Sequence, residues 1–473
     1  MPLKALSQET TCEYEFVSIS QSEILKSHLN DSSIQRKGGY RIVHFGDSHI
    51  QADRITSHVR EAFQEVGGNG GSGIIFPYSL CGSFGPNGVE SQVKGKFTYA
   101  TQLKNPSSVP LGVMGYSISL QQGAELSFVF NENFRGKKTS SITVWIHSPI
   151  DTVHLQLDST WTLAQRKAVG LGIFAYTYQS NEIPNQLRLK ANENMAFWGI
   201  EFNQTQGVSY QQNGLVGAQF THLIAHEDHV VRQLTEIKPD LLIFSYGTNE
   251  AYDNIDSLSY YRKVSNFIKR IKTSFPNTSI LITNAPDTRS SGRTPPSQVL
   301  VNETLRAVAL QGQAAYYDLN KAMGGWGSLH TWSKKGFTLK DQLHFNKEGA
   351  RVLGLLMAEA MFTATGIGQE SQLEAMKKEI TAALCKNPQE PVTPEIVKPQ
   401  QEPITTPLAE KPKPPVEKKK TSPSSKKNRI YVVKSGDTLS GIAQKTHTTV
   451  KHLLSKNKIS ATDIIRPGQK LKY

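Results

Sequence analysis

The chain has 473 residues, of which 37% are hydrophobic and 20% charged, and its formal net charge is +13. This length accommodates two or three domains with a large buried core. No run of 18 or more apolar residues occurs, so no transmembrane helix is predicted.

The positive charge is concentrated at the C-terminal end. From Lys386 onward, 18 Lys and Arg residues stand against 7 Asp and Glu residues, whereas the preceding 385 residues carry 35 basic and 33 acidic side chains. This distribution argues against a nucleic-acid-binding core. It favours a basic anchoring segment that meets an anionic surface.

Three cysteines, Cys12, Cys81 and Cys385, lie far apart, and no CxxC pair occurs. Neither a zinc site nor a disulfide scaffold is therefore predicted, and the thiols are expected to be unpaired. No HxH or HExxH spacing occurs either, so no metal or other cofactor is expected.

Residues 1–38 are interpreted as an N-terminal extension, and residues 39–66 as strand, turn and helix. The strand is the apolar run RIVHF, which stops at Gly46-Asp47-Ser48-His49. A helix beginning near Gln51 would aim backbone N–H groups and a partial positive charge at Ser48.

Residues 85–205 have a different pattern of apolar and polar residues. The segments SITVWIHS and TVHLQLDS alternate apolar and polar residues with a period of two, between Ser, Gly, Asn and Pro residues. This pattern predicts an all-β insertion of about a hundred residues, which is the size of a domain.

Residues 239–366 return to alternating strands and helices. PDLLIFSYG, TSILITNAP and AAYYDLN are predicted strands, and the segments SLSYYRKVSNFIKRIKTSF, VLVNETLRAVALQGQ and NKEGARVLGLLMAEAMF are predicted helices. This alternation of strands and helices is typical of a parallel, doubly wound α/β sheet. The α/β domain is then discontinuous, comprising residues 39–84 and 206–386.

Residues 387–428 are predicted to be a linker. They contain ten prolines, the run Lys418-Lys419-Lys420 and almost no large apolar residues. Such a segment cannot bury a core and is expected to be extended and semi-rigid. Residues 429–473 must then form a separate small domain.

Active sites of open α/β sheets lie at the C-terminal ends of the strands. Three groups of candidate catalytic residues occur at such places, after predicted strands or before the last helix. Ser48 follows the first strand, Asn249 lies in the GTNE segment after PDLLIFSY, and Asp341 and His344 precede the last helix. A serine nucleophile needs a base, and the base needs an orienting group. Since residues three apart meet across one turn, Asp341 can hold His344 while His344 takes the proton of Ser48.

The oxyanion of the reaction would need hydrogen-bond donors. The backbone N–H of Ser48, the side-chain amide of Asn249 and the backbone N–H of Gly217 are predicted to supply them, each worth about 3–4 kcal/mol in the transition state. Glu250 is expected to hydrogen-bond the turn. His49 is open to two interpretations, a residue lining the substrate cleft or a structural histidine.

These blocks resemble, in order, those of the SGNH (GDSL-like) hydrolases: Gly46-Asp47-Ser48, Gly217, Gly247-Thr248-Asn249 and Asp341-Gln-Leu-His344. The resemblance implies a flavodoxin-like three-layer sandwich and an esterase that uses Ser and His, with Gly and Asn in the oxyanion hole. For the glycine block, Gly214 competes with Gly217. The segments GDSH, GNGGSGIIFP and SYGTNEAYD resemble those of the peptidoglycan O-acetylesterase and O-acetyltransferase subgroup. Some members of this subgroup carry a β-rich, carbohydrate-binding-like insertion between the serine block and the glycine block, the interval in which the insertion is predicted here.

The C-terminal segments YVVKSGDTLSGIAQKTHTTVKHLLSKNKI and IIRPGQKLKY resemble a LysM domain, a small βααβ fold. The resemblance implies binding of glycans that contain N-acetylglucosamine through two loops. The corresponding residues here are Gly436, Asp437, Thr438, Leu439, Ile465, Arg466 and Pro467.

Together the resemblances imply a wall-bound serine esterase that removes O-acetyl groups from peptidoglycan strands of N-acetylglucosamine and N-acetylmuramic acid. Three alternatives remain open: an O-acetyltransferase with the same residues, a non-catalytic glycan-binding protein, and an esterase for other acetylated polysaccharides or lipids. The first residues, MPLKALSQETTCEYEF, lack the apolar region of a signal peptide. Export to the periplasm or cell wall is nevertheless expected, with the leader absent from this chain.

Overall fold

The computed structural model describes residues 13–104, 109–148, 150, 152–253, 255–289, 293–385, 430–433, 442, 446, 448, 450–457 and 469–472. The chain divides into two compact units, Met1–Pro403 and Ile404–Tyr473. None of the helices formed by the described residues is long and apolar enough to span a bilayer.

The first unit is built on a five-stranded sheet in the order β14-β1-β15-β16-β17, in which every neighbouring pair is parallel. The predicted parallel sheet is therefore confirmed. Its strands are β1 (Tyr40–Gly46), β14 (Val208–Gly214), β15 (Leu241–Ser245), β16 (Ser279–Thr283) and β17 (Ala315–Tyr317).

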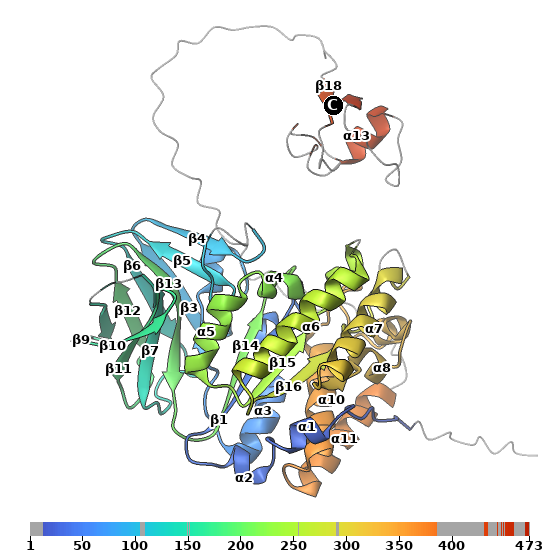
Figure 1. Cartoon of the computed structure of the whole chain (residues 1–473), viewed down its shortest axis with the longest axis horizontal. Helices are drawn as coiled ribbons and strands as arrows, with labels where there is room; N and C mark the ends of the chain where they lie inside the picture. Colours follow the sequence, from blue (N-terminus) through green and yellow to red (C-terminus); the bar gives the residue numbers. More distant parts are fainter. Residues whose placement is uncertain are drawn as a thin grey trace, which may run out of the picture. The chain divides into compact units, whose positions relative to one another are not determined.

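Both faces of this sheet are buried, which explains the nearly continuous apolar strands. Along β1, Ile42 joins the core on one face, whereas Val43 and Phe45 join the core on the other. One face is covered by helices α3 (Thr56–Gly67), α10 (Lys347–Thr365) and α11 (Glu370–Cys385), and the other by α4 (Phe220–Ile224), α5 (Glu227–Ile237), α6 (Ser257–Ser274) and α7 (Pro296–Gln311) (Figure 1). This arrangement is the predicted three-layer sandwich.

Two antiparallel sheets lie beside the α/β sandwich (Figure 1). The first has the order β10-β11-β7-β13-β5-β4, with β2 also pairing to β13, and the second has the order β3-β6-β12-β8-β9. Their strands are β2 (Ile74–Ile75), β3 (Val89–Lys94), β4 (Phe97–Thr101), β5 (Tyr116–Leu120), β6 (Glu125–Phe130), β7 (Ser141–His147), β8 (His154–Leu157), β9 (Thr160–Thr162), β10 (Gln165–Gly170), β11 (Ile173–Gln179), β12 (Gln186–Lys190) and β13 (Met195–Asn203).

The antiparallel sheets share a hydrophobic core with one face of the parallel sheet. Phe197 and Trp198 of β13 belong to the same cluster of buried residues as Phe244 of β15 and Phe267 of α6. The β-rich segment is thus packed onto the α/β sandwich rather than merely tethered to it.

Several short elements connect these layers. The short α-helices are α1 (Glu23–Lys26), α2 (Asp31–Ile34), α8 (Leu319–Ala322) and α9 (Ser328–Lys334), and the 3-10 turns are η1 (Gln51–Asp53), η2 (Tyr78–Cys81) and η3 (Glu250–Tyr252).

The second unit has an antiparallel pair of strands, β18 (Ile430–Val432) and β19 (Lys470–Lys472), and a helix α13 (Val450–Asn457). Asn457 at the end of the helix joins it to β19: its side-chain amide donates to the carbonyl of Lys472 at 2.8 Å and its carbonyl accepts from the N–H of Lys472 at 2.7 Å. The first helix of the expected βααβ fold would span Leu439–Thr446, and these residues lie largely outside the described ones.

Two local expectations are wrong. The segment after Ser48 is the 3-10 turn η1, and the α-helix begins only at Thr56, so no α-helix N-terminus begins at Gln51. Cys385 is disulfide-bonded, while Cys81 is free and buried. Cysteines far apart in the sequence can form a disulfide, because folding can bring distant segments together.

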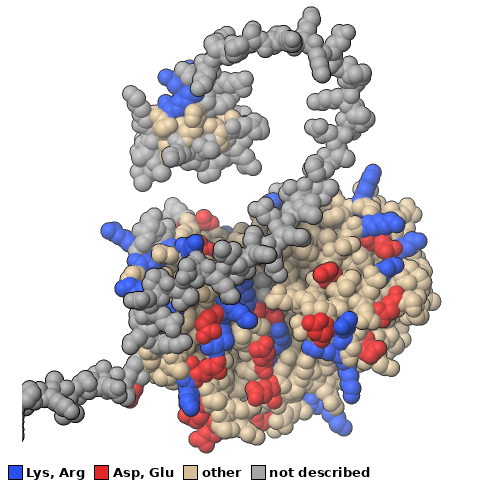
Figure 2. Space-filling view, turned by 180° about the vertical axis from the view of Figure 1, so that it is seen from behind, with Lys and Arg blue, Asp and Glu red and all other residues tan. Residues whose placement is uncertain are grey.

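Acidic and basic side chains both occur across the face of the molecule seen in Figure 2. This mixture is consistent with the nearly balanced charge of the first 385 residues.

Candidate active site

The turn after β1 places Ser48 at the C-terminal edge of the parallel sheet. β1 lies between β14 and β15, and Gly46 at its end is in register with Gly214 and Ser245. Ser48 follows this register position by two residues, so its hydroxyl group lies beyond the edge of the sheet. Its side chain is partly exposed.

His344 and Asp341 lie in the turn before α10 and complete a chain of hydrogen bonds with Ser48. The hydroxyl oxygen of Ser48 is 2.8 Å from Nε2 of His344, and Nδ1 of His344 is 2.8 Å from Oδ2 of Asp341. With Nδ1 protonated, His344 donates to Asp341 and leaves Nε2 to accept the proton of Ser48. The structure thus brings together all three residues predicted as nucleophile, base and orienting group.

Asp341 is held in place by the turn that it begins. Its Oδ1 accepts from the backbone N–H groups of Leu343 and His344, both at 3.0 Å. Partial burial acts to raise the pKa of Asp341, but the hydrogen bonds from His344 and Leu343 outweigh burial and lower the pKa. Asp341 therefore stays ionised and oriented toward His344 at neutral pH.

Asn249 and the loop after β14 meet at the same edge of the sheet. The side-chain amide of Asn249 donates to the carbonyl of Ala218 at 2.8 Å. An amide group has two hydrogens, so one remains available for a substrate oxygen. Gly217 precedes Ala218, is exposed and has a φ of +80°, which favours glycine.

The competing candidate, Gly214, has a different role. It is buried at the end of β14, and a Cβ atom there would lie 2.5 Å from the carbonyl carbon of Ile50 and 2.8 Å from the carbonyl oxygen of Asp47. Gly214 therefore allows β14 to approach the serine turn closely, whereas Gly217 has open space around it.

Glu250 supports the loop that carries Asn249, as its sequence position suggested. It accepts from the backbone N–H of Phe220 at 2.8 Å, from the hydroxyl of Tyr260 at 2.9 Å and from the backbone N–H of Gly247 at 3.1 Å. Burial raises the pKa of Glu250 to about 7, although these hydrogen bonds act in the opposite direction.

Gln51 is a site-supporting residue that sequence analysis missed. Its side chain is buried; it accepts from the N–H of Val216 at 2.7 Å and donates to the hydroxyl of Ser83 at 2.6 Å and the carbonyl of Phe84 at 3.0 Å. Gln51 thereby links the serine turn to the loop that carries Gly217. A single glutamine after the motif carries no pattern that predicts this role.

The residues predicted to bind glycan in the second unit lie outside the described residues. These are Gly436, Asp437, Thr438, Leu439, Ile465, Arg466 and Pro467.

Two family models match the chain. Residues 185–352 match the GDSL-like lipase/acylhydrolase family, and residues 431–472 match the LysM domain. The chain contains a GDSL-like hydrolase domain and a C-terminal LysM domain. Ser48 lies outside the matched interval of the GDSL-like domain, yet the fold places it 2.8 Å from His344, which lies inside that interval.

A solved structure shares the fold. A structure described as a peptidoglycan O-acetylesterase superposes with a TM-score of 0.62 at 24% identity, covering 73% of this chain and 96% of that one. A lipase/acylhydrolase from Enterococcus faecalis aligns with a TM-score of 0.27 at 19% identity, covering 34% of this chain and 78% of that one. No curated protein sequence matches the chain.

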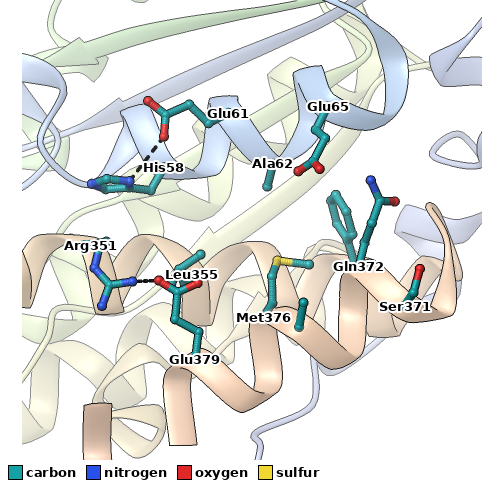
Figure 3. Close-up of a pocket in the computed structure, with 12 residues that line it drawn as sticks. His58, Glu61, Ala62, Glu65, Arg351, Leu355, Ser371, Gln372, Met376 and Glu379 are labelled. Atoms are coloured by element: carbon teal, nitrogen blue, oxygen red, sulfur yellow. Dashed lines mark ion pairs between the residues drawn. The ribbon is translucent and has the colours of Figure 1, made fainter. Parts of the chain in front are cut away.

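A larger cavity of about 560 Å³ lies elsewhere in the GDSL-like domain, between helices α3, α10 and α11 (Figure 3). Ion pairs join His58 to Glu61 and Arg351 to Glu379 on its walls. None of its lining residues is a candidate catalytic residue, whereas Ser48 and His344 line a separate, smaller pocket with Arg54 and Phe345. Chemistry rather than size therefore identifies the candidate active site.

Proposed function

We propose that the protein is a serine esterase that removes O-acetyl groups from peptidoglycan. The observation that carries this proposal is the hydrogen-bonded series Ser48, His344 and Asp341 at the C-terminal edge of the parallel sheet. The superposition on a peptidoglycan O-acetylesterase over 96% of its length supports the choice of substrate, as does the LysM domain.

The geometry suggests the following reaction. The hydroxyl of Ser48 gives its proton to Nε2 of His344 as its oxygen attacks the acetyl carbonyl. Asp341 accepts the hydrogen bond from Nδ1 and stabilises the imidazolium that forms. His344 then gives the proton to the sugar oxygen as the bond from that oxygen to the acetyl carbon breaks, which releases the sugar hydroxyl, and water attacks the acetyl-serine by the reverse sequence.

The negative charge on the acetyl oxygen needs donors during both steps. The backbone N–H of Ser48, the backbone N–H of Gly217 and the second amide hydrogen of Asn249 are proposed to supply them. Because Asn249 already donates to Ala218 at 2.8 Å, its amide is oriented before substrate binds.

The LysM domain is proposed to hold the enzyme on the glycan. Tethering raises the local concentration of substrate without adding a catalytic group. We propose, on this basis, that the protein acts outside the cytoplasm, in the periplasm or at the cell wall. The disulfide at Cys385 supports that location, because disulfides persist in oxidising compartments.

The decisive experiment measures acetate release from O-acetylated peptidoglycan by the full chain and by the Ser48→Ala variant. Release by the full chain but not by the variant is expected. A chain ending at Pro403, the boundary between the two compact units, is expected to keep activity on a small acetyl ester and to lose binding to peptidoglycan.

Other outcomes would point elsewhere. Transfer of the acetyl group to an added sugar without net acetate release would identify a transferase. Binding to peptidoglycan with no serine-dependent release or transfer would contradict catalysis altogether.

A further inference from the structure

His49, the residue after the candidate nucleophile, lies between two hydrogen-bond acceptors. Its side chain is buried, with Nδ1 3.0 Å from Oδ1 of Asp47 and Nε2 3.0 Å from the carbonyl oxygen of Leu343. Leu343 belongs to the turn that carries Asp341 and His344. One histidine therefore joins the serine turn to the turn of the candidate base.

The chemistry of these partners specifies the form of the imidazole. A neutral imidazole donates from one nitrogen only, and the other nitrogen would face an acceptor with its own lone pair. The doubly protonated ring donates to both the carboxylate of Asp47 and the carbonyl of Leu343. Its positive charge is balanced by Asp47, which also accepts from the backbone N–H of His49 at 2.9 Å.

Other charged and polar groups around His49 agree with this form. Thr248 contacts Nδ1 of His49 at 3.4 Å and hydrogen-bonds Asp47, and the more distant Asp341 adds negative charge. The ring of His344 lies 5.5 Å away, centroid to centroid. Burial acts to lower the pKa of His49, but Asp47 and the carbonyl of Leu343 outweigh burial and raise the pKa. Burial likewise acts to raise the pKa of Asp47, and His49 and Thr248 reverse that effect.

His44 on β1 provides an internal contrast. It is equally buried, but its ring nitrogens contact two hydroxyl groups, Tyr210 at 2.8 Å and Ser245 at 2.6 Å. A hydroxyl can donate or accept, so a neutral ring satisfies both contacts. Burial lowers the pKa of His44 to about 3, which agrees with a neutral ring.

The turn that His49 contacts contains one residue in an unfavourable backbone conformation. Hydrogen bonds restrain the backbone carbonyls of its last three residues, Gln342 to His344. Gln342 has a φ of +54°, which is unfavourable for a residue with a Cβ atom. Its carbonyl accepts from the backbone N–H of Arg289 at 3.1 Å, and the carbonyl of His344 accepts from the N–H of Leu339 at 2.8 Å. The contact with His49 restrains the remaining carbonyl, that of Leu343. Such backbone conformations persist only where contacts with the surrounding structure hold them in place.

We infer that His49 is a permanently charged imidazolium, balanced by Asp47, that fixes the Leu343 carbonyl and so positions His344 against Ser48. The charge of His49 follows from its own contacts, whereas its positioning role rests on the proposed function. His49 is a positioning residue, because it contacts the turn of the base rather than the reacting atoms.

Histidine-selective 13C and 15N labelling of the full chain tests the charge directly. Between pH 5 and pH 9, one ring is expected to keep both N–H protons throughout, and another, that of His44, is expected to stay neutral. If no ring remains doubly protonated at pH 9, the inference is overturned, because Asp47 and His49 would then share a single proton as a neutral pair.

Two variants assign the doubly protonated ring. Asp47→Asn removes the balancing charge, so the signal should begin to titrate within the measured range. Thr248→Val, which removes one hydroxyl beside Asp47, should shift the same signal without abolishing it. Should the signal stay unchanged in both variants, it belongs to a different histidine and the inference fails.

The positioning role is tested by kinetics on a small acetyl ester. His49→Leu removes the donor to Leu343 and is expected to lower kcat by about 100-fold with little change in KM, since a displacement of about 1 Å has an effect of that size. His49→Gln retains an amide donor and should recover about tenfold of that loss. Removing His49 alone would leave the buried carboxylate of Asp47 without a balancing charge. The same comparison of Leu and Gln at position 49 is therefore repeated in a protein that also carries Asp47→Asn. Equal activity of His49→Leu and the unmodified protein would overturn the positioning role.

The two proposals fail in different ways. Ser48→Ala should abolish hydrolysis while leaving the doubly protonated signal of His49 in place. If the unmodified protein hydrolyses no ester but the signal is present, the proposed function fails and the charge of His49 stands. If hydrolysis is serine-dependent but the signal is absent, only the inference about His49 fails.

Discussion

Gly46 and Gly214 lie opposite each other as the last register pair of β1 and β14, and neither has room for a side chain. A Cβ on Gly46 would lie 2.7 Å from the carbonyl oxygen of Ser245, and a Cβ on Gly214 would lie 2.5 Å from the carbonyl carbon of Ile50. The serine turn is therefore packed directly against both neighbouring strand ends. Its position depends on the absence of two side chains.

This packing predicts different effects for Gly214 and Gly217, the two glycines that compete for the glycine block. Gly214→Ala forces a Cβ into backbone atoms and should lower the free energy of unfolding by about 3 kcal/mol. Gly217→Ala meets only Leu103 at 4.0 Å and should cost about 1 kcal/mol for its positive φ. Urea unfolding measures both values. Equal losses would contradict the separate roles assigned to Gly214 and Gly217.

The orienting role proposed for Asp341 predicts a loss of activity that asparagine at this position cannot prevent. Asp341→Asn keeps an oxygen that can accept from the N–H groups of Leu343 and His344. Its amide nitrogen would face Nδ1 of His344 and favour the tautomer with Nε2 protonated, which cannot accept the proton of Ser48. We expect kcat on a small acetyl ester to fall by about 10³-fold or more with the melting temperature nearly unchanged. Activity within a few-fold of the unmodified protein would show that Asp341 does not orient the base.

Asn249 predicts a selective loss in the chemical step. Asn249→Ala removes the proposed donor to the oxyanion and should lower kcat by about 10²–10³-fold with little change in KM. Because it also removes the hydrogen bond to Ala218, thermal unfolding of the variant serves as the control. A rise in KM at constant kcat would instead assign Asn249 to ground-state binding.

Glu250 predicts a pH-dependent stability. Its pKa is about 7 in the folded protein, raised from the value of 4.5 expected without burial. The folded state therefore binds the proton more tightly, so its contribution to stability is complete below pH 4.5 and falls as the pH rises to about 7. The shift corresponds to a loss of about 3 kcal/mol. Urea unfolding between pH 4.5 and 7.5 measures the free energy of unfolding of the unmodified protein and of Glu250→Gln. The variant should lack this part of the pH dependence. If the difference in free energy between the two proteins does not vary with pH, the raised pKa is contradicted.

The sequence predicted the parallel sheet because its strands are buried on both faces and end in small or polar residues. Ser48, Asn249, Asp341 and His344 were recognisable because each block lies at a strand end or before the last helix. The structure adds their distances, which no spacing along the chain could supply, since Ser48 and His344 are separated by the entire β-rich segment.

Other features depend on contacts between distant residues and leave no local pattern. The role of Gln51 arises only because its side chain reaches Val216 and Phe84. The choice between the two interpretations of His49 depends on the carbonyl of Leu343, 294 residues further along the chain. The start of α3 at Thr56 was missed because η1, a 3-10 turn, occupies the residues after the motif.

The central position of β1 has a consequence for how the protein is made. Its two neighbours in the sheet, β14 and β15, begin at Val208 and Leu241, so a ribosome synthesises them after the strands β2 to β13 of the two antiparallel sheets in the first unit. At about 5–20 residues per second, the first neighbour follows β1 by roughly 8–30 s. During that time the antiparallel strands can pair with one another, whereas β1 has no strand beside it. The serine turn is thus synthesised early, but it can reach its final shape only after β14 and β15 have been made.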